Sequence, residues 1–252
     1  PIQSGKITFM GKNYIPKTPK QGLEAGIGLI PEDRKAQGCV LTQSIRENIV
    51  YSILKKISKM SVIQKKSEEE YVFKEMNVKT PSPEQLVKNL SGGNQQKVVL
   101  AKAMATECEV LIFDEPTVGL DPEERIHFRN LFSRTAQNRL VLLSTHIIED
   151  VQSVCDQLVV INHGHILFAG SPTQLISAAA GHVGIFLESD GRRNQISETA
   201  MQEQGVHITA RVNTSRGIRC RMVAEQLPDY VQPEEPTLED AYLYLISKEV
   251  HA

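Results

Sequence analysis

The hydrophobic and polar positions of this chain form short, solidly apolar runs separated by longer stretches with helical periodicity. Apolar residues fill 110–113 and 140–143 without interruption, and a third short run covers 27–30. Uninterrupted runs of this length predict strands of a parallel sheet that are buried on both faces. Residues 6–10 alternate weakly before Gly11 and predict a short antiparallel strand. Strands separated by helical stretches indicate an α/β fold.

Helical segments lie between the apolar runs. Isoleucines repeat at one-turn spacing within 42–59, which predicts a helix. Two further helical segments, 61–76 and 83–89, complete a helical insertion over about 42–97. The acid-led segment 122–137 begins with a proline, which suits the first turn of a helix.

The composition of the chain changes beyond Gly181. Polar, glycine-containing turns separate three short strand candidates: 183–187, 206–212 and 219–223. A threonine followed by acidic residues begins a final helix over 237–246. We therefore expect a main domain over 1–181 and a small α/β subdomain over 182–252, with no chemistry of its own visible in the second.

Charge and cysteine content exclude several classes of protein. With 28 basic and 30 acidic residues the formal net charge is −2, which gives no reason to expect nucleic acid as a partner. Four scattered cysteines without a CxxC pair are typical of a reducing compartment. No apolar run approaches the roughly 18–20 residues that a membrane span needs, and the first residues do not resemble a signal peptide. We expect a soluble protein, or one that is peripheral on a membrane through a partner.

The sequence LSGGNQQK at 90–97 carries the first candidate site. Ser91 is a natural helix N-cap, and Gly92 and Gly93 have no side chains to obstruct close approach. Such a helix start directs free backbone N–H groups and the positive end of the helix dipole at an anion. A lone Ser-Gly-Gly, however, is far more often a plain turn.

The second candidate site lies where the run 110–113 ends in Asp114 and Glu115. A parallel strand would deliver both carboxylates at its carboxyl edge, where open α/β sheets bind ligands. An apolar strand that ends in an acid is common, but the two segments in this order and spacing form a specific combination. Together they predict a site for phosphate and Mg²⁺.

The two segments resemble the signature and Walker B motifs of ATP-binding cassette (ABC) ATPases. The resemblance implies a P-loop NTPase-like core with a mostly parallel sheet, an antiparallel β part and a helical subdomain, and it implies ATP and Mg²⁺ as ligands. It implies that Asp114 holds Mg²⁺, that Glu115 is the general base, and that His146, after the strand 140–143, contacts the γ-phosphate. It further implies a set of residues near the nucleotide: Ser91, Gly92, Gly93 and Gln95 of the signature, Glu32 of the Q-loop and Asp121 of the D-loop.

One motif of the family does not occur in these 252 residues, the Walker A sequence G-x-x-x-x-G-K-[ST]. That loop lends backbone N–H groups and a lysine to the β- and γ-phosphates. We therefore expect little ATP turnover by the chain alone, and bare apolar surface where the P-loop strand and helix would pack. Three explanations stay open: a missing upstream segment, a loop supplied by another chain, or a rebuilt core.

The resemblance changes character along the chain. The wording PEDRK at 31–35 and LSGGNQQK at 90–97 is similar to the second cassette of monosaccharide-importer ATPases. From Gly119 onward, including His146 and PTLEDAYLYL at 236–245, the chain is more similar to the ATPase of ABC-2-type exporters. A chimeric chain and an unusual natural one both explain this change, and the transported substrate and direction stay open.

The resemblance implies an ATP-hydrolysing subunit, or a fragment of one, that powers an ABC transporter. Its implied partners are a second ABC cassette, paired head to tail, and transmembrane permease subunits on the inner face of the cell membrane. The cassette itself would be cytoplasmic. The alternatives are a non-transport ABC protein of translation or DNA repair, and an inert cassette that offers its signature to another chain's nucleotide in trans.

Overall fold

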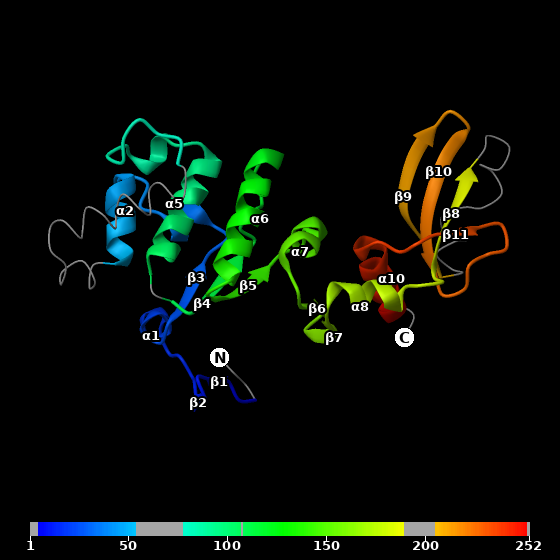
Figure 1. Ribbon diagram of the computed structural model, residues 1–252, viewed down its shortest axis with the longest axis horizontal. Coiled ribbons are helices and arrows are strands. Elements are labelled where there is room, and N and C mark those ends of the chain that lie inside the picture. The colour runs from blue at the N-terminus through cyan, green and yellow to red at the C-terminus, as the bar shows by residue number, and fades with distance from the viewer. Residues whose placement is uncertain (1–4, 54–77, 107, 189–204, 251–252) are drawn as a thin grey trace. The chain divides into compact units, whose positions relative to one another are not determined.

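The computed structural model describes residues 5–53, 78–106, 108–188 and 205–250 (Figure 1). The chain forms two compact units, Pro1–His146 and Ile147–Ala252, and each is described here by itself. No helix in the described part of the chain is long and apolar enough to cross a membrane.

A three-stranded parallel sheet forms the centre of the first unit. Strands β3 (Ile27–Ile30), β4 (Val110–Asp114) and β5 (Leu140–Ser144) lie in the order β3-β4-β5. In register, Phe113 lies between Ile30 and Leu143, and Asp114 pairs with Ser144. All three strands predicted from the apolar runs are confirmed, as is the parallel sheet.

One face of this sheet is buried under two helices, α5 (Gly92–Ala105) and α6 (Pro122–Ala136), which lie beside the strands in Figure 1. Ile30, Leu111 and Phe113 are fully buried on that face. The rings of Phe113 and Phe132 have centroids 4.8 Å apart, so β4 and α6 share an aromatic contact. This face is the core of the first unit.

The opposite face of the sheet is apolar and exposed. Leu29 is 62% exposed, Leu140 57% and Leu142 48%. The prediction that the strands are buried on both faces is therefore wrong for β5 and for Leu29 of β3, because these side chains point away from α5 and α6, and no described element of the first unit covers them. An exposed apolar face is what the sequence predicts for a core without its P-loop strand and helix.

The helices begin at the polar residues that the sequence singled out. Ser91 caps α5 and accepts from the backbone N–H of Asn94, while Asp121 caps α6 ahead of a proline. Helix α2 (Ile45–Ser52) begins with a capping box in which Ser44 and Glu47 bond each other's backbone. The predicted helix 61–76 and the end of 42–59 lie outside the described residues.

The predicted helix 83–89 is wrong apart from its last turn. Only a short 3₁₀ turn forms there, η2 (Val87–Asn89). The backbone N–H groups of Val87 and Lys88 donate instead to the carbonyls of Gln43 and Leu41, respectively, with a donor–acceptor distance of 3.0 Å in each case. The segment therefore lies alongside the residues before α2, and its donors are no longer available for a helix.

The remaining elements of the first unit are small. Strands β1 (Thr8–Phe9) and β2 (Lys12–Asn13) form an antiparallel hairpin, and β1 confirms the short antiparallel strand predicted before Gly11. Helix α1 (Pro19–Glu24) precedes β3, and a π-helical turn, η1 (Arg34–Gly38), follows it.

The second unit combines helices with antiparallel strands. Its elements follow in this order: α7 (Ile148–Val154), β6 (Leu158–Asn162), β7 (His165–Gly170), α8 (Pro172–Ala178), β8 (Val183–Glu188), β9 (Val206–Thr214), β10 (Gly217–Ala224), β11 (Gln232–Pro233) and α10 (Leu238–Val250). The hairpin β6-β7 stands alone, and the other strands form an antiparallel sheet in the order β11-β8-β10-β9. The three strands and the final helix predicted beyond Gly181 are confirmed.

The core of the second unit includes residues from both sides of position 181. Val160 and Leu175 pack in one cluster with Val223, Leu238 and Tyr244. The predicted domain limit at residue 181 stays a prediction.

Candidate functional site

Strand β4 delivers the two predicted carboxylates at the carboxyl edge of the sheet. Asp114 is its last residue and pairs with Ser144 of β5. Glu115 follows with a φ of 44°, a left-handed conformation that is uncommon for a residue with a side chain. Its backbone N–H donates to the carbonyl of Ser144 over 2.9 Å, which fixes this conformation against β5. Strained backbone of this kind is concentrated at functional sites.

The structure brings Glu115 together with His146, which were predicted as general base and γ-phosphate contact. The Nδ1 atom of His146 lies 2.9 Å from Oε1 of Glu115. The histidine side chain is 73% exposed, whereas that of Glu115 is only 19% exposed. The carboxylate is thus held by the ring on one oxygen, while the ring itself stays open to solvent.

The second oxygen of the same carboxylate is a buried acceptor without a partner. Among the described residues, Oε2 of Glu115 has no hydrogen-bond donor and almost no solvent contact. A buried acceptor left unsatisfied is costly, and because this oxygen has almost no solvent contact, a donor could reach it only after the groups around it move. An ionised carboxylate with one free oxygen has the chemistry of a general base.

The carboxylate at this edge fits the small share of ligands that a protein usually supplies to Mg²⁺. No cluster of three or more histidine, cysteine or acidic side chains suited to a metal occurs in the described part of the chain. Mg²⁺ usually keeps several waters and takes one or two carboxylates together with phosphate oxygens. Asp114 could supply that share.

The signature turn has the capped geometry that the sequence predicts. The hydroxyl of Ser91 accepts from the backbone N–H of Asn94 at 3.4 Å and from its side-chain amide at 2.9 Å. Ser91 is exposed, and Gly92 and Gly93 are half-buried. The turn therefore presents its hydroxyl and its first amides on an accessible helix start, as an anion site requires.

Gln95 points into the protein. Its side chain is buried, and its amide donates to the carbonyls of Val87 at 3.3 Å and Leu90 at 3.2 Å. These bonds hold η2 against the start of α5, so Gln95 supports the turn from behind. Its predicted place next to a nucleotide stays a prediction.

Asp121 and Glu32 lie in exposed turns. The Oδ1 atom of Asp121 accepts from the backbone N–H of Glu124 at 2.8 Å and so caps α6. Glu32 follows β3 and is exposed. Neither hydrogen-bonds to Ser91, Glu115 or His146 among the described residues, so the structure brings together only the pair Glu115 and His146 out of the predicted set.

Two features near the signature were missed from the sequence. The guanidinium of Arg34, in η1, lies against Gly92, where an added Cβ would be 2.8 Å from Nη2. Lys97 is buried and forms an ion pair with Glu124 of α6. A sequence signal for the lysine existed, because it lies one turn after Gly93 and directly before the apolar run 98–101 of α5. Its partner, 27 positions away, could not be identified without the structure.

The comparisons with known proteins agree with the geometry. Residues 1–118 match the family model described as ABC transporter. The chain is 41% identical over 167 residues to the ribose import ATP-binding protein RbsA of Hahella chejuensis, covering 64% of the chain and 33% of that protein. It is 40% identical over 168 residues to the protein of the same name from Bacillus licheniformis, covering 65% of the chain and 34% of that protein.

The chain thus spans about a third of the length of the curated relatives it matches. The match to the family model ends just after the acid pair and includes the signature, the two segments on which the predicted site depends. Residues 1–118 of this chain, which contain both segments, are therefore similar in sequence to the ABC transporter family.

Proposed function

We propose that the chain is an ATP-binding part of an ABC transporter that imports a sugar. Its first 118 residues match the family, and the relatives named ribose import ATP-binding proteins support a monosaccharide as the cargo. The similarity to exporter ATPases beyond Gly119 stays a prediction, since both of these relatives are named as importers.

The contact between Glu115 and His146 is the observation that supports ATP hydrolysis most directly. Oε1 of Glu115 accepts from Nδ1 of the ring at 2.9 Å. Oε2 is buried and has no donor among the described residues, and it would accept a proton from the attacking water once that water reaches it. The exposed edge of the ring carries Nε2, which donates to a phosphate oxygen when the imidazole is protonated.

Asp114 would hold Mg²⁺ at the same edge of the sheet. The ion would neutralise charge on the β- and γ-phosphates. Asp121 would face the nucleotide from the turn before α6, and Glu32 from the turn after β3. These roles rest on the resemblance to the family and on the positions of the residues at strand ends.

Ser91, Gly92 and Gly93 would bind a nucleotide that another cassette presents in trans. The exposed helix start and the hydroxyl of Ser91 support this role. Because the Walker A sequence does not occur in these residues, the P-loop would come from outside them. The exposed apolar face formed by Leu29, Leu140 and Leu142 is the surface on which a further strand and helix would pack.

Turnover of ATP by the purified chain, alone and mixed with a P-loop-bearing cassette, tests this function. We expect little turnover alone and a clear gain in the mixture. Ser91→Ala should reduce that gain because it removes the hydroxyl from the signature turn, and Lys88→Ala, an exposed neighbour in η2, is the matched control. Robust turnover by the chain alone that Glu115→Gln abolishes would contradict the requirement for an external P-loop.

Co-purification with a permease tests the proposed role in transport. The proposal predicts that a permease co-purifies with the chain and that its loss releases the chain from the membrane. Recovery of ribosomes or DNA in place of a permease would instead support the non-transport alternative.

A further inference from the structure

Lys97 is a buried charge that the proposed chemistry does not use. Its side chain is only 3% exposed, and that of Glu124 is 14% exposed. The Nζ atom lies 3.0 Å from Oε2 and 3.2 Å from Oε1 of Glu124. Burying an ammonium group is strongly unfavourable unless it is paired, so the contact with Glu124 stabilises Lys97 in its buried position.

The ion pair joins two turns that the proposed function places beside nucleotides. Lys97 lies one helical turn after Gly93 on α5, and the backbone of Glu124 is bonded to Asp121 at the start of α6. The side chain of Glu124 also lies directly on Gly93, because an added Cβ there would be 3.2 Å from both Cγ and Cδ of the glutamate. The side chain of Glu124 therefore contacts α5 at both Gly93 and Lys97.

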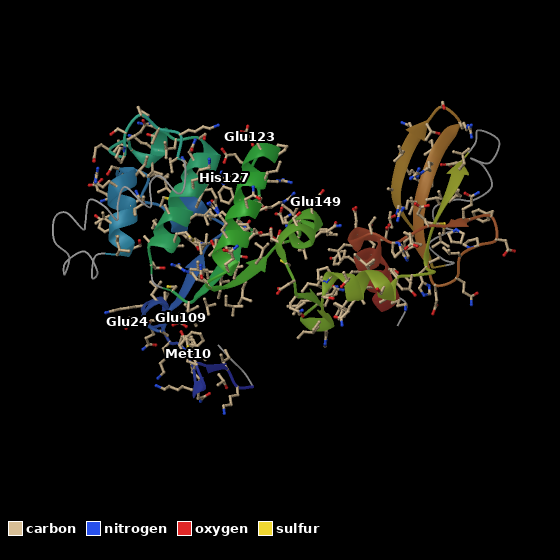
Figure 2. The ribbon with its side chains drawn as sticks, viewed as in Figure 1. Met10, Glu24, Glu109, Glu123, His127 and Glu149 are labelled. Atoms are coloured by element: carbon tan, nitrogen blue, oxygen red, sulfur yellow. The ribbon has the colours of Figure 1, made fainter. Side chains whose placement is uncertain are left out.

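A titratable side chain, His127, lies close to the pair on α6. Figure 2 shows Glu123 at the beginning of α6 and His127 further along the same helix. Burial lowers the pKa of His127, and the positive charge of Lys97 lowers it further, against an opposing effect of Glu124. The charge of Lys97 is thus felt beyond its direct partner, as expected where water screens poorly.

We propose that the ion pair between Lys97 and Glu124 is a positioning device that makes the signature turn and the Asp121 turn move together when a nucleoside triphosphate binds. A shift of Gly93 is transmitted through the pair to the first turn of α6, and a shift of that turn is transmitted back to Gly93. It also gives Gly93 a second reason to lack a side chain, because Glu124 already occupies that space. The importance of this coupling for ATP use rests on the proposed function; the coupling itself does not.

Hydrogen exchange of the chain by itself tests the coupling without any nucleotide. Glu124→Gln keeps the shape of the side chain and removes its charge, and Lys97→Met removes the other charge. We expect each variant to raise amide exchange by about tenfold in both 91–94 and 119–124. The charge-swapped double variant K97E/E124K should return both segments toward the wild-type rates, and Glu123→Gln, an exposed acid in the same turn, should change neither.

The outcomes separate coupling from simple packing. A rise confined to the segment of the substituted helix, or no rise at all, would overturn the proposal. Should Lys97→Met fail to fold, the milder Glu124→Gln and the charge-swapped variant still decide the matter, since each has its own expected pattern.

A second measurement tests the coupling where ATP is used. In the mixture with a P-loop-bearing cassette, Glu124→Gln should raise KM for ATP about tenfold with a smaller change in kcat, and the charge-swapped variant should restore KM. An unchanged KM in Glu124→Gln would overturn the part of the proposal that concerns nucleotide. If Ser91→Ala also has no effect there while the exchange pattern holds, the proposed function fails and the mechanical coupling stands.

Discussion

Replacing Phe113 by alanine should destabilise the first unit more than any change on the other side of its sheet. Phe113 is buried in β4 and packs against Phe132 of α6 with a centroid distance of 4.8 Å. Truncating a buried phenylalanine costs about 3–5 kcal/mol, because apolar area is lost and a cavity remains. Leu142 of the neighbouring strand is 48% exposed on the opposite face. Its replacement by alanine should cost only about 1 kcal/mol, roughly half of what full burial of a leucine contributes.

Native-state hydrogen exchange of the β4 amides is a suitable assay, since it reports on the first unit alone in a chain with two compact units. Phe113→Ala should lower the free energy of opening by about 2–4 kcal/mol more than Leu142→Ala. Equal losses in the two variants would show that the face carrying Leu142 is covered, and would refute the reasoning about a bare sheet face. If Phe113→Ala lowered the free energy of opening by less than about 1 kcal/mol, this would contradict the place of Phe113 in the core.

Three further predictions concern individual groups. Burial raises the pKa of Asp240, but hydrogen bonds from Arg221 and two threonines have the larger combined effect and hold the pKa below its usual value of 3.8. The stabilisation that the ionised carboxylate contributes is therefore present above about pH 4 and is lost as the pH falls further. Asp240→Asn should accordingly flatten the acid side of a curve of unfolding free energy against pH for the second unit. Burial raises the pKa of Cys39 to about 11, so its thiol should react with a disulfide reagent at pH 8 roughly a hundredfold more slowly than in the urea-unfolded chain, and equal rates would contradict its burial. In the mixture that supplies a P-loop, Glu115→Gln and His146→Ala should each lower kcat by about a hundredfold or more with a smaller change in KM, and unchanged turnover would exclude them from the chemistry.

The strands and helix starts could be predicted because each depends on local sequence. Four apolar residues in a row at 110–113 and 140–143 formed the expected parallel strands, with β5 next to β4. Ser91 and Asp121 capped the expected helices, since a capping side chain needs only neighbours within three positions. The acid pair then followed β4 at the edge of the sheet, as the strand direction requires.

The features that the sequence did not reveal depend on contacts between distant residues. The exposure of Leu140 and Leu142 reflects which element covers a face, and an apolar run does not specify that. The segment before Leu90 formed a 3₁₀ turn because its donors bond to Leu41 and Gln43. The burial of Lys97 against Glu124 joins two helices through side chains 27 positions apart. Resemblance predicted the roles of Glu115 and His146 separately, but not their direct contact.

ATP-dependent cross-linking tests most directly whether the signature faces a nucleotide held by another cassette. Ser91→Cys in this chain would be mixed with a cassette carrying a cysteine in its P-loop, and mass spectrometry would locate the disulfide. The account predicts that the cross-link forms when ATP is present, that it is lost without ATP, and that Gly93→Asp prevents it. A cross-link whose yield is the same with and without ATP, or no cross-link under either condition, would contradict a signature that binds nucleotide in trans.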